Sequence, residues 1–435
     1  DVKASRGLGD VYKRQTMTIS ASMPLVDATL SLLPCAKPLR VFECSYRFGI
    51  FVTKLSFPMK KNIINLVCLT FILSQTACAQ KENTPPLKTP TSVSYTTELV
   101  VPDVEVPWGM VFLPNGSLLY TEKEGKLIRF QYGKKNEISG LPTTYVRGQG
   151  GLMGIALHPD FEQNNRIYFT MATANEDASG GNTGLYTALL IGNTLSDVKL
   201  LYKAMPDTKK GVHFGSRIVF DADGYLYFSV GDRGERDLNP QDITRDNGKI
   251  YRLNDDGSIP NDNPFVGVDG AKEAIYSYGH RNPQGLTIHP ETGAVWAHEH
   301  GPRGGDEINI IEAGKNFGWP KITYGKNYSG TTITKNRSLP GMEQPFYYWV
   351  PSIAASGMAF VTGDKYPDWK GSILAGSLKK SYLERLTVRD NKVVAREKIA
   401  ADIGRVRDVI MGPYGYIHIA VEYEGIYRIK PKTTR

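Results

Sequence analysis

The chain has 435 residues, of which 41% are hydrophobic and 22% are charged, a composition typical of a globular protein. Its net charge is +8, but residues 1–78 hold ten Lys/Arg and four Asp/Glu and so supply six of the eight charges. Because the remainder is nearly neutral and has no basic stripe, the sequence argues against a nucleic-acid-binding protein.

The first 97 residues are not expected to belong to the folded domain. Residues 1–58 show no hydrophobic period and are predicted to be extraneous or unstructured. Residues 59–78 predict a signal peptide, because two lysines precede a short apolar run that ends in small residues. The end of this run resembles a lipoprotein processing site with Cys78 as the lipid anchor, and simple cleavage one residue later is the alternative. Residues 79–97 predict a polar tether, so we expect an exported protein, periplasmic or anchored to the outer membrane.

All four cysteines lie at or before Cys78. The part of the chain after this residue therefore has no thiol nucleophile, no zinc-thiolate site and no disulfide. Its stability must come from a hydrophobic core, for which about 350 residues are ample.

Six related segments follow one another along residues 98–430, the predicted catalytic domain. Each has two alternating apolar runs around a turn, which is the pattern of an antiparallel hairpin. The segments begin at Trp108, Gly151, Arg217, Gly285, Gly357 and Asp408. Six copies predict an all-β fold, a six-bladed β-propeller with few helices. A two-sheet sandwich is the alternative, but it does not explain the repetition.

Residues 278–320 are the richest in candidate chemistry. They contain, in order, Arg281, Asn282, Gly301, Pro302, Asp306 and Glu307. Guanidinium and carboxamide donors suit an anionic ligand, whereas carboxylates and backbone carbonyls suit a calcium-like ion. Lys379, Arg405 and Arg407 lie further along, beside apolar strands. These cations predict a multiply anionic, planar ligand held over a metal.

Eight motifs, in order, carry a family resemblance. They are GQGGLMGIALHPDF, HFGSR, YLYFSVGDRG, YSYGHRNPQGL, EHGPRGGDEIN, GKNFGWP, SLK and RVRDV. Over about residues 98–430 the chain resembles the soluble quinoprotein aldose sugar dehydrogenases, relatives of soluble glucose dehydrogenase. The resemblance implies a propeller enzyme that uses pyrroloquinoline quinone (PQQ) and Ca²⁺ to oxidise aldose sugars at C1 to lactones. It further implies an external electron acceptor, and a monomer or homodimer is expected.

The resemblance also implies a role for each candidate residue. His213 is implied as the general base, Asp232 as the carboxylate that orients it, and Arg281 as a group that stabilises the reduced quinone together with Ca²⁺. The implied cofactor-binding residues are Gln149, Arg281, Asn282, Tyr328, Ser377, Leu378, Lys379, Arg405, Val406 and Arg407. The implied metal ligands are Gly301 and Pro302 for the calcium at the cofactor, and Glu307 and Phe317 for a second, structural calcium.

Three departures from the family pattern bear on these implications. Val212 stands where the glucose-preferring branch has an Asp, and Asp237 stands where that branch has a carboxamide. Both changes favour the broader aldose-oxidising branch. In addition, the final repeat is short around residues 422–425, which leaves closure of the ring open.

Two other functions fit the same fold. A calcium-dependent propeller lactonase or esterase would need a cage of acidic and amide side chains, but no cationic set. A non-catalytic, cell-surface binding propeller would need neither His213 nor Arg281, and both are present here.

Overall fold

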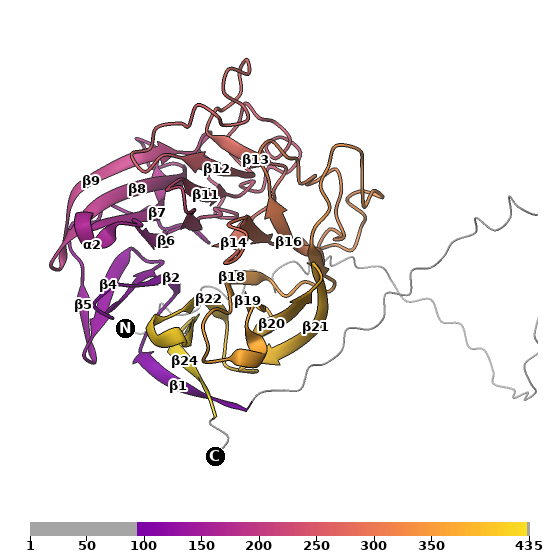
Figure 1. Ribbon diagram of the computed structural model, residues 1–435. Coiled ribbons are helices and arrows are strands. Elements are labelled where there is room, and N and C mark those ends of the chain that lie inside the picture. Colours follow the sequence, from indigo (N-terminus) through magenta and orange to yellow (C-terminus); the bar gives the residue numbers. More distant parts are fainter. Residues whose placement is uncertain (1–93, 433–435) are drawn as a thin grey trace, which may run out of the picture. The chain divides into compact units, whose positions relative to one another are not determined.

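The computed structural model describes residues 94–432, which form six four-stranded antiparallel sheets arranged as blades around a central axis (Figure 1). This arrangement confirms the predicted all-β, six-bladed β-propeller and excludes the sandwich. The predicted extraneous segment 1–58 and signal peptide 59–78 lie outside the described residues, as does most of the tether. Within residues 94–432, no helix has the length and apolar character needed to cross a membrane.

In five blades the four strands are consecutive in the sequence. Blade 1 contains β2 (Pro107–Phe112), β3 (Leu118–Glu122), β4 (Lys126–Gln131) and β5 (Lys134–Glu137), and blade 2 contains β6 (Leu152–Leu157), β7 (Arg166–Ala174), β8 (Gly181–Ile191) and β9 (Thr194–Lys203). Blade 3 contains β10 (Ile218–Phe220), β11 (Leu226–Val230), β12 (Lys249–Leu253) and β13 (Ile275–Tyr278), and blade 4 contains β14 (Pro283–Ile288), β15 (Val295–Glu299), β16 (Asp306–Ile311) and β17 (Tyr347–Trp349). Blade 5 contains β18 (Ala355–Phe360), β19 (Ile373–Ser377), β20 (Tyr382–Arg389) and β21 (Lys392–Ile399).

Blade 6 joins the two ends of the domain and closes the ring. It contains β22 (Val406–Met411), β23 (Ile417–Val421), β24 (Gly425–Pro431) and, at its outer edge, β1 (Tyr95–Pro102). Strand β1 runs antiparallel to β24, and Figure 1 shows it in indigo beside the yellow end of the chain. The first strand thus settles the closure that the short final repeat left open. Residues 95–97, the last three of the segment 79–97 that was expected to be a tether, belong to this strand, because they pair with the edge of β24.

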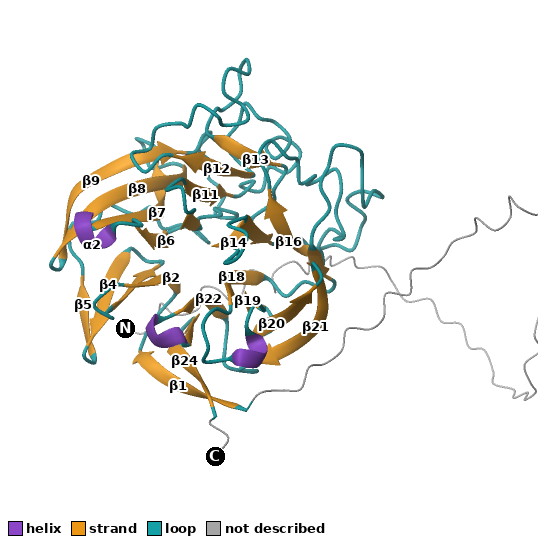
Figure 2. Ribbon diagram, viewed as in Figure 1, coloured by secondary structure: helices purple, strands orange, loops and turns teal. Residues whose placement is uncertain are grey.

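Helices are few, as the absence of a long 3.6-residue period predicted. Among the described residues they are α2 (Phe161–Asn164) and the 3₁₀ turns η2 (Pro367–Trp369) and η3 (Pro413–Gly415). Figure 2 shows that strands make up the ring, while long loops gather around blades 3 and 4. One of these loops connects β16 to β17 and begins with the end of the motif-rich segment, residues 312–320.

Each pair of neighbouring blades shares one apolar cluster. Leu119 and Leu127 of blade 1, for example, pack in one cluster with Ile167 and Phe169 of blade 2. Comparable clusters join each of the five remaining pairs of neighbouring blades. Successive side chains of a strand point to opposite faces, and the second strands of the blades, such as β3, β11 and β19, are buried along their whole length, so they supply packed groups to both faces of each blade.

The first strands of the blades lie closest to the axis, where each contacts the first strands of its two neighbours. Their packing is tight enough to require glycine, since a Cβ atom on Gly154 would lie 2.1 Å from the Ser216 carbonyl oxygen. Because neighbouring strands are antiparallel, the start of each first strand and the end of each second strand lie at the same end of the axis. Twelve chain segments therefore border one mouth of the propeller.

Candidate active site

The sequence-predicted site residues gather at this mouth. Gln149, His213, Arg281 and Arg405 precede first strands, whereas Asp232, Gly301 and Lys379 follow second strands. Each blade except the first contributes at least one of these residues. The topology thus brings together side chains that lie up to 256 residues apart in the sequence, from Gln149 to Arg405, which the motifs alone did not show.

A histidine–aspartate pair lies at the centre of the site. The Nδ1 atom of His213 is 2.6 Å from Oδ1 of Asp232. Asp232 is almost fully buried, and its two oxygens accept further bonds from the Gly234 N–H (2.7 Å) and from Nε1–H of Trp319 (2.8 Å). Since an ionised carboxylate only accepts hydrogen bonds, Nδ1 carries the proton and Nε2 carries the lone pair. His213 is therefore arranged to accept a proton at Nε2.

The electrostatics of the pair keep the imidazole neutral. Burial and the Arg281 guanidinium lower the pKa of His213 below its ordinary value, although Asp232 opposes this shift. Burial raises the pKa of Asp232, but His213, Arg281 and the Gly234 N–H outweigh it and hold that pKa below the usual range. At neutral pH the pair is thus an uncharged base beside a carboxylate.

The backbone of His213 is held in an unusual conformation. Its φ of 55° lies in the left-handed region, which non-glycine residues adopt rarely and at a cost in free energy. The side chain of Gln149 accepts a bond from the His213 N–H (2.8 Å), and Arg233 donates to the carbonyl oxygens of Val212 and Lys210. Arg233 was not singled out from the sequence, although it follows Asp232 directly in the VGDRG motif.

Arg281 and Asn282 lie beside this pair. Nη1 of Arg281 donates to the carbonyl oxygens of His300 (3.0 Å) and Gly301 (2.9 Å), which fixes the buried guanidinium at the mouth. Asn282 accepts a bond from the Gly215 N–H (3.1 Å), but its own Nδ2 is buried and has no partner among the described residues. An unpaired buried amide is costly, so Asn282 is set up to donate to a ligand.

A second cationic group comes from blade 6. Arg405 and Arg407 both bind Glu422, with N–O distances of 2.6 and 2.8 Å from their Nε atoms. Arg405 also donates to the Leu378 carbonyl oxygen (2.9 Å), and the guanidinium of Arg407 lies 4.2 Å from the centre of the Trp108 ring. Two guanidinium groups on one carboxylate leave a net positive charge for an anion. Strand β22 pairs with β23, and Val406 lies opposite Val421. A predicted hairpin over these residues could therefore have placed Glu422, the next residue, beside Arg405.

Gln284 links the two halves of the site. Its Oε1 accepts a weak bond from Nη1 of Arg407 (3.4 Å), and its Nε2 donates to the Gly215 carbonyl oxygen (3.0 Å). Gly215 lies two residues after the base and also contacts Asn282. Gln284 belongs to the GHRNPQGL motif but received no role from the sequence.

The remaining predicted cofactor residues differ in their exposure. Lys379 is exposed and makes no ion pair with any described residue, and Tyr328 is 60% exposed. Ser377 and Val406 have buried side chains, and the Ser377 hydroxyl donates to the Ile353 carbonyl oxygen (2.9 Å). Ser377 and Val406 thus help to build the blades, and only their backbone groups remain for a ligand.

The predicted metal ligands form two sets. Gly301 donates its N–H to Asp306 (2.9 Å), whose carboxylate also accepts the N–H groups of Ile353 and Ala354. Asp306 therefore shapes the loop that presents the Gly301 and Pro302 carbonyls. Among residues 94–432, no group of three or more His, Cys, Asp and Glu side chains is placed to hold a metal.

Glu307 belongs to the second set and lies directly opposite Glu299 across strands β16 and β15. Burial and the charge of Glu299 raise the pKa of Glu307 well above its ordinary value. Asn309 contacts Glu299 (3.2 Å) and keeps a buried oxygen without a partner among the described residues. Phe317 is buried and stacks on His280, 4.7 Å between ring centres. Two facing carboxylates and an unpaired oxygen fit a hard cation.

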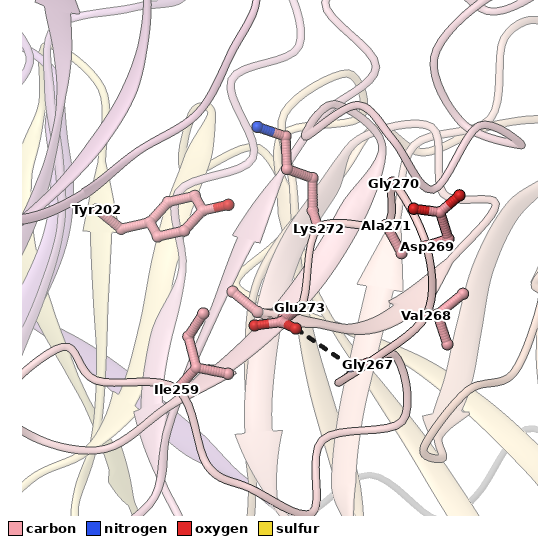
Figure 3. A pocket seen from close by; sticks show the side chains of 10 residues that line it. Tyr202, Ile259, Gly267, Val268, Asp269, Gly270, Ala271, Lys272 and Glu273 are labelled. Atoms are coloured by element: carbon pink, nitrogen blue, oxygen red, sulfur yellow. Dashed lines mark hydrogen bonds between the residues drawn. The ribbon is translucent and has the colours of Figure 1, made fainter.

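Two cavities lie outside the histidine–aspartate centre. The pocket in Figure 3, of about 500 Å³, is lined by the loop before β13, and Glu273 there accepts the Gly267 N–H (3.1 Å). A second cavity of about 280 Å³ runs along the axis between the first strands, and Arg217 and Asp408 lie in its wall. Neither is lined by His213 or Asp232, so neither marks the active site.

Comparison with known proteins decides the family. The sequence matches the family model described as Glucose / Sorbosone dehydrogenase over residues 104–428. The chain belongs to this family. Aldose sugar dehydrogenase YliI from Escherichia coli K12 is 41% identical over 332 residues, covering 75% of this chain and 89% of that protein. Quinoprotein glucose dehydrogenase B from Acinetobacter calcoaceticus is 30% identical over 331 residues, covering 69% of this chain and 66% of that protein.

Solved structures of sugar dehydrogenases agree with this assignment. The apo form of the soluble aldose sugar dehydrogenase from Escherichia coli has a TM-score of 0.74 at 38% identity, covering 78% of this chain and all of that one. The PQQ-bound aldose sugar dehydrogenase from Streptomyces coelicolor has a TM-score of 0.64 at 26% identity, covering 78% and 99%. Membership of the glucose/sorbosone dehydrogenase family confirms the predicted resemblance and the prediction of a sugar-oxidising enzyme.

Proposed function

We propose that this sugar dehydrogenase oxidises aldoses at C1 to lactones, with PQQ as the hydride acceptor and His213 as the general base. The observation that carries the proposal is the 2.6 Å contact between His213 and the buried Asp232, with Arg281 beside it at the same mouth. This is the arrangement that removal of a hydroxyl proton requires when a hydride leaves the same carbon.

His213 would act at its Nε2 atom. Asp232 holds the ring through Nδ1 and stabilises the imidazolium that forms when the hydroxyl proton arrives. The lowered pKa of His213 keeps Nε2 free of a proton at neutral pH before the reaction starts. The proton then moves from the C1 hydroxyl of the sugar to Nε2, while the two electrons leave with the hydride.

Arg281 would stabilise the negative charge that the hydride acceptor gains. Its guanidinium is buried and fixed by two carbonyl oxygens, so its charge is in place before the reaction and needs no rearrangement. Preorganised charge of this kind in a water-poor site is the most effective form of electrostatic catalysis.

The residues present fit PQQ and calcium. Asn282 offers an unpaired buried amide, and Arg405 and Arg407 offer more positive charge than Glu422 neutralises. When bound, PQQ supplies the two-electron acceptor and Ca²⁺ polarises its carbonyl group. The side chains that would hold PQQ are those of Gln149, Asn282, Tyr328, Lys379, Arg405 and Arg407, together with the backbone of Ser377, Leu378 and Val406. The carbonyl oxygens of Gly301 and Pro302 would hold the calcium ion. Glu307 and the Phe317 carbonyl would take a second calcium.

Both alternative functions are less compatible with this site. A lactonase would need its calcium held by a cage of acidic and amide side chains on the axis, and residues 94–432 contain no group of three or more His, Cys, Asp and Glu side chains that could form the acidic part of such a cage. A propeller that only binds proteins has no use for a buried, oriented base such as His213. Membership of a sugar dehydrogenase family points the same way.

Ligand-induced stabilisation tests the cofactor assignment. A ligand that binds only the folded state raises the melting temperature, so PQQ with Ca²⁺ is expected to raise that of the apo-protein, and PQQ with a chelator to raise it less. Lys379→Ala should reduce the shift. Lys370→Ala, a change at another exposed lysine of blade 5, should leave it unchanged. A melting curve that saturating PQQ and Ca²⁺ do not move would contradict the assignment.

A further inference from the structure

Trp319 touches both charged groups at the centre of the site. Its indole Nε1–H donates to Oδ2 of Asp232 at 2.8 Å, and the guanidinium carbon of Arg281 lies 5.5 Å from the centre of its ring. The side chain is only 7% exposed. It belongs to the GKNFGWP motif, to which the sequence assigned no role beyond the Phe317 carbonyl.

We propose that Trp319 is a positioning residue that sets the proton affinity of His213 through its hydrogen bond to Asp232. The inference deepens the proposed function, because it rests on His213 as the base. It assigns Trp319 no contact with substrate or cofactor.

The argument starts from the acceptor sites of Asp232. Oδ1 accepts bonds from His213 and from the Gly234 N–H, whereas the only donor to Oδ2 among the described residues is Trp319. The indole N–H draws part of the carboxylate charge toward Oδ2 and fixes the plane of the carboxylate. Both effects limit how strongly Oδ1 attracts a proton to the imidazole. Without the bond, Oδ2 would be buried and unpaired, and Asp232 would stabilise the imidazolium more strongly.

Other charged groups around the pair come from different elements. Arg281 precedes β14, Arg233 follows Asp232 in its own loop, and His300 lies in the loop after β15. Lys249 of β12 lies behind the carboxylate, where it donates to the Asn239 carbonyl oxygen (2.7 Å). None of them binds Oδ2, so a change confined to the Trp319 N–H leaves their contacts with the pair in place.

The test is an NMR titration of the histidine side chains in the apo-protein, with His213 assigned by its absence from His213→Gln. Trp319→Phe keeps an aromatic ring but removes the N–H. It is expected to raise the pKa of His213 by roughly half a unit to one unit. Trp296→Phe is the matched control, because the Nε1 of Trp296 is also buried but has no partner among the described residues. The control should leave the pKa of His213 unchanged.

A second measurement needs no substitution at the site. The indole N–H signal of Trp319 in the wild-type protein should shift with pH at the same midpoint as His213. The proposal would be overturned if the pKa of His213 were unchanged in Trp319→Phe. It would also be overturned if the indole N–H signal of Trp319 in the wild type did not shift as His213 titrates. A loss of activity without a change in pKa would also overturn it, since this is the result of a merely structural role.

The pH dependence of kcat/KM separates this inference from the proposed function. A base with a raised pKa is protonated at higher pH, so the acid limb of the profile should move upward in Trp319→Phe by the same amount. If the pKa of His213 rises but the acid limb stays in place, Trp319 positions the pair as inferred and His213 is not the base.

Discussion

Replacement of His213 by alanine is expected to lower kcat by about 10²–10⁴-fold, the usual range for loss of a general base. The base acts only while the hydroxyl proton moves, so its loss affects the transition state and not the bound ground state. The affinity for PQQ should therefore change by less than about threefold. Steady-state kinetics with a saturating aldose, and a PQQ titration of the apo-protein, measure the two quantities.

Two further variants serve as comparisons for His213→Ala. Arg281→Ala should lower both PQQ affinity and kcat, since its charge lies at the mouth before and during the reaction. His289→Ala should retain wild-type kinetics, because His289 follows β14 at the opposite end of the blade. A His213→Ala protein that oxidises aldoses at a near wild-type rate would contradict the mechanism even if PQQ is bound.

Replacement of Arg217 by alanine is expected to destabilise the fold by about 3–5 kcal/mol, the usual cost of breaking a buried ion pair from one side. Arg217 is buried, and its guanidinium binds Asp408 (2.9 Å) and the carbonyl oxygens of Gln284 (2.7 Å) and Arg407 (2.9 Å). Asp408 in turn accepts the Met110 N–H (2.9 Å). The pair thus joins the first strands of blades 1, 4 and 6 to the start of blade 3. Urea denaturation of wild type and variant measures the free energy of unfolding.

The exposed pair Lys370–Asp364 provides the control for this prediction. Its side chains are 63% and 94% exposed, so solvent screens their attraction. Lys370→Ala should therefore change the free energy of unfolding by less than about 1 kcal/mol. An Arg217→Ala protein that is as stable as the Lys370→Ala protein would show that the axial pair does not hold the blades together.

The architecture was predictable because every blade repeats one local pattern. Alternating apolar runs around turns rich in Pro, Asp, Asn and Gly specify the two inner strands, and six copies specify the ring. The outermost strands were harder to predict, since they are exposed and lack a strict period, as the fully exposed β5 shows. The domain was expected to begin at residue 98, and no repeat was recognised before Trp108, so strand β1 (Tyr95–Pro102) was not predicted. Its partner β24 lies more than 320 residues away, so no local signal marks Tyr95–Thr97.

The candidate site was predictable where the family resemblance named a residue, as for His213 and Asp232. Side chains that act through long-range contacts were missed. Trp319 and Asp232 are 87 residues apart, and their contact depends on the relation between blades 3 and 4. Gln284 and Arg407 are 123 residues apart and meet only because blades 4 and 6 face the same axis. Sequence motifs identify such residues but not their partners.

Aldose-dependent dye reduction by the purified protein, reconstituted with PQQ and Ca²⁺, tests the central claim most directly. We predict turnover with several aldoses, no turnover when PQQ is omitted or calcium is chelated, and loss of at least about 10²-fold in His213→Ala. Trp296→Phe, reconstituted in the same way, should match the wild type. A correctly folded protein that binds PQQ and Ca²⁺ but reduces no dye with any aldose would contradict the account.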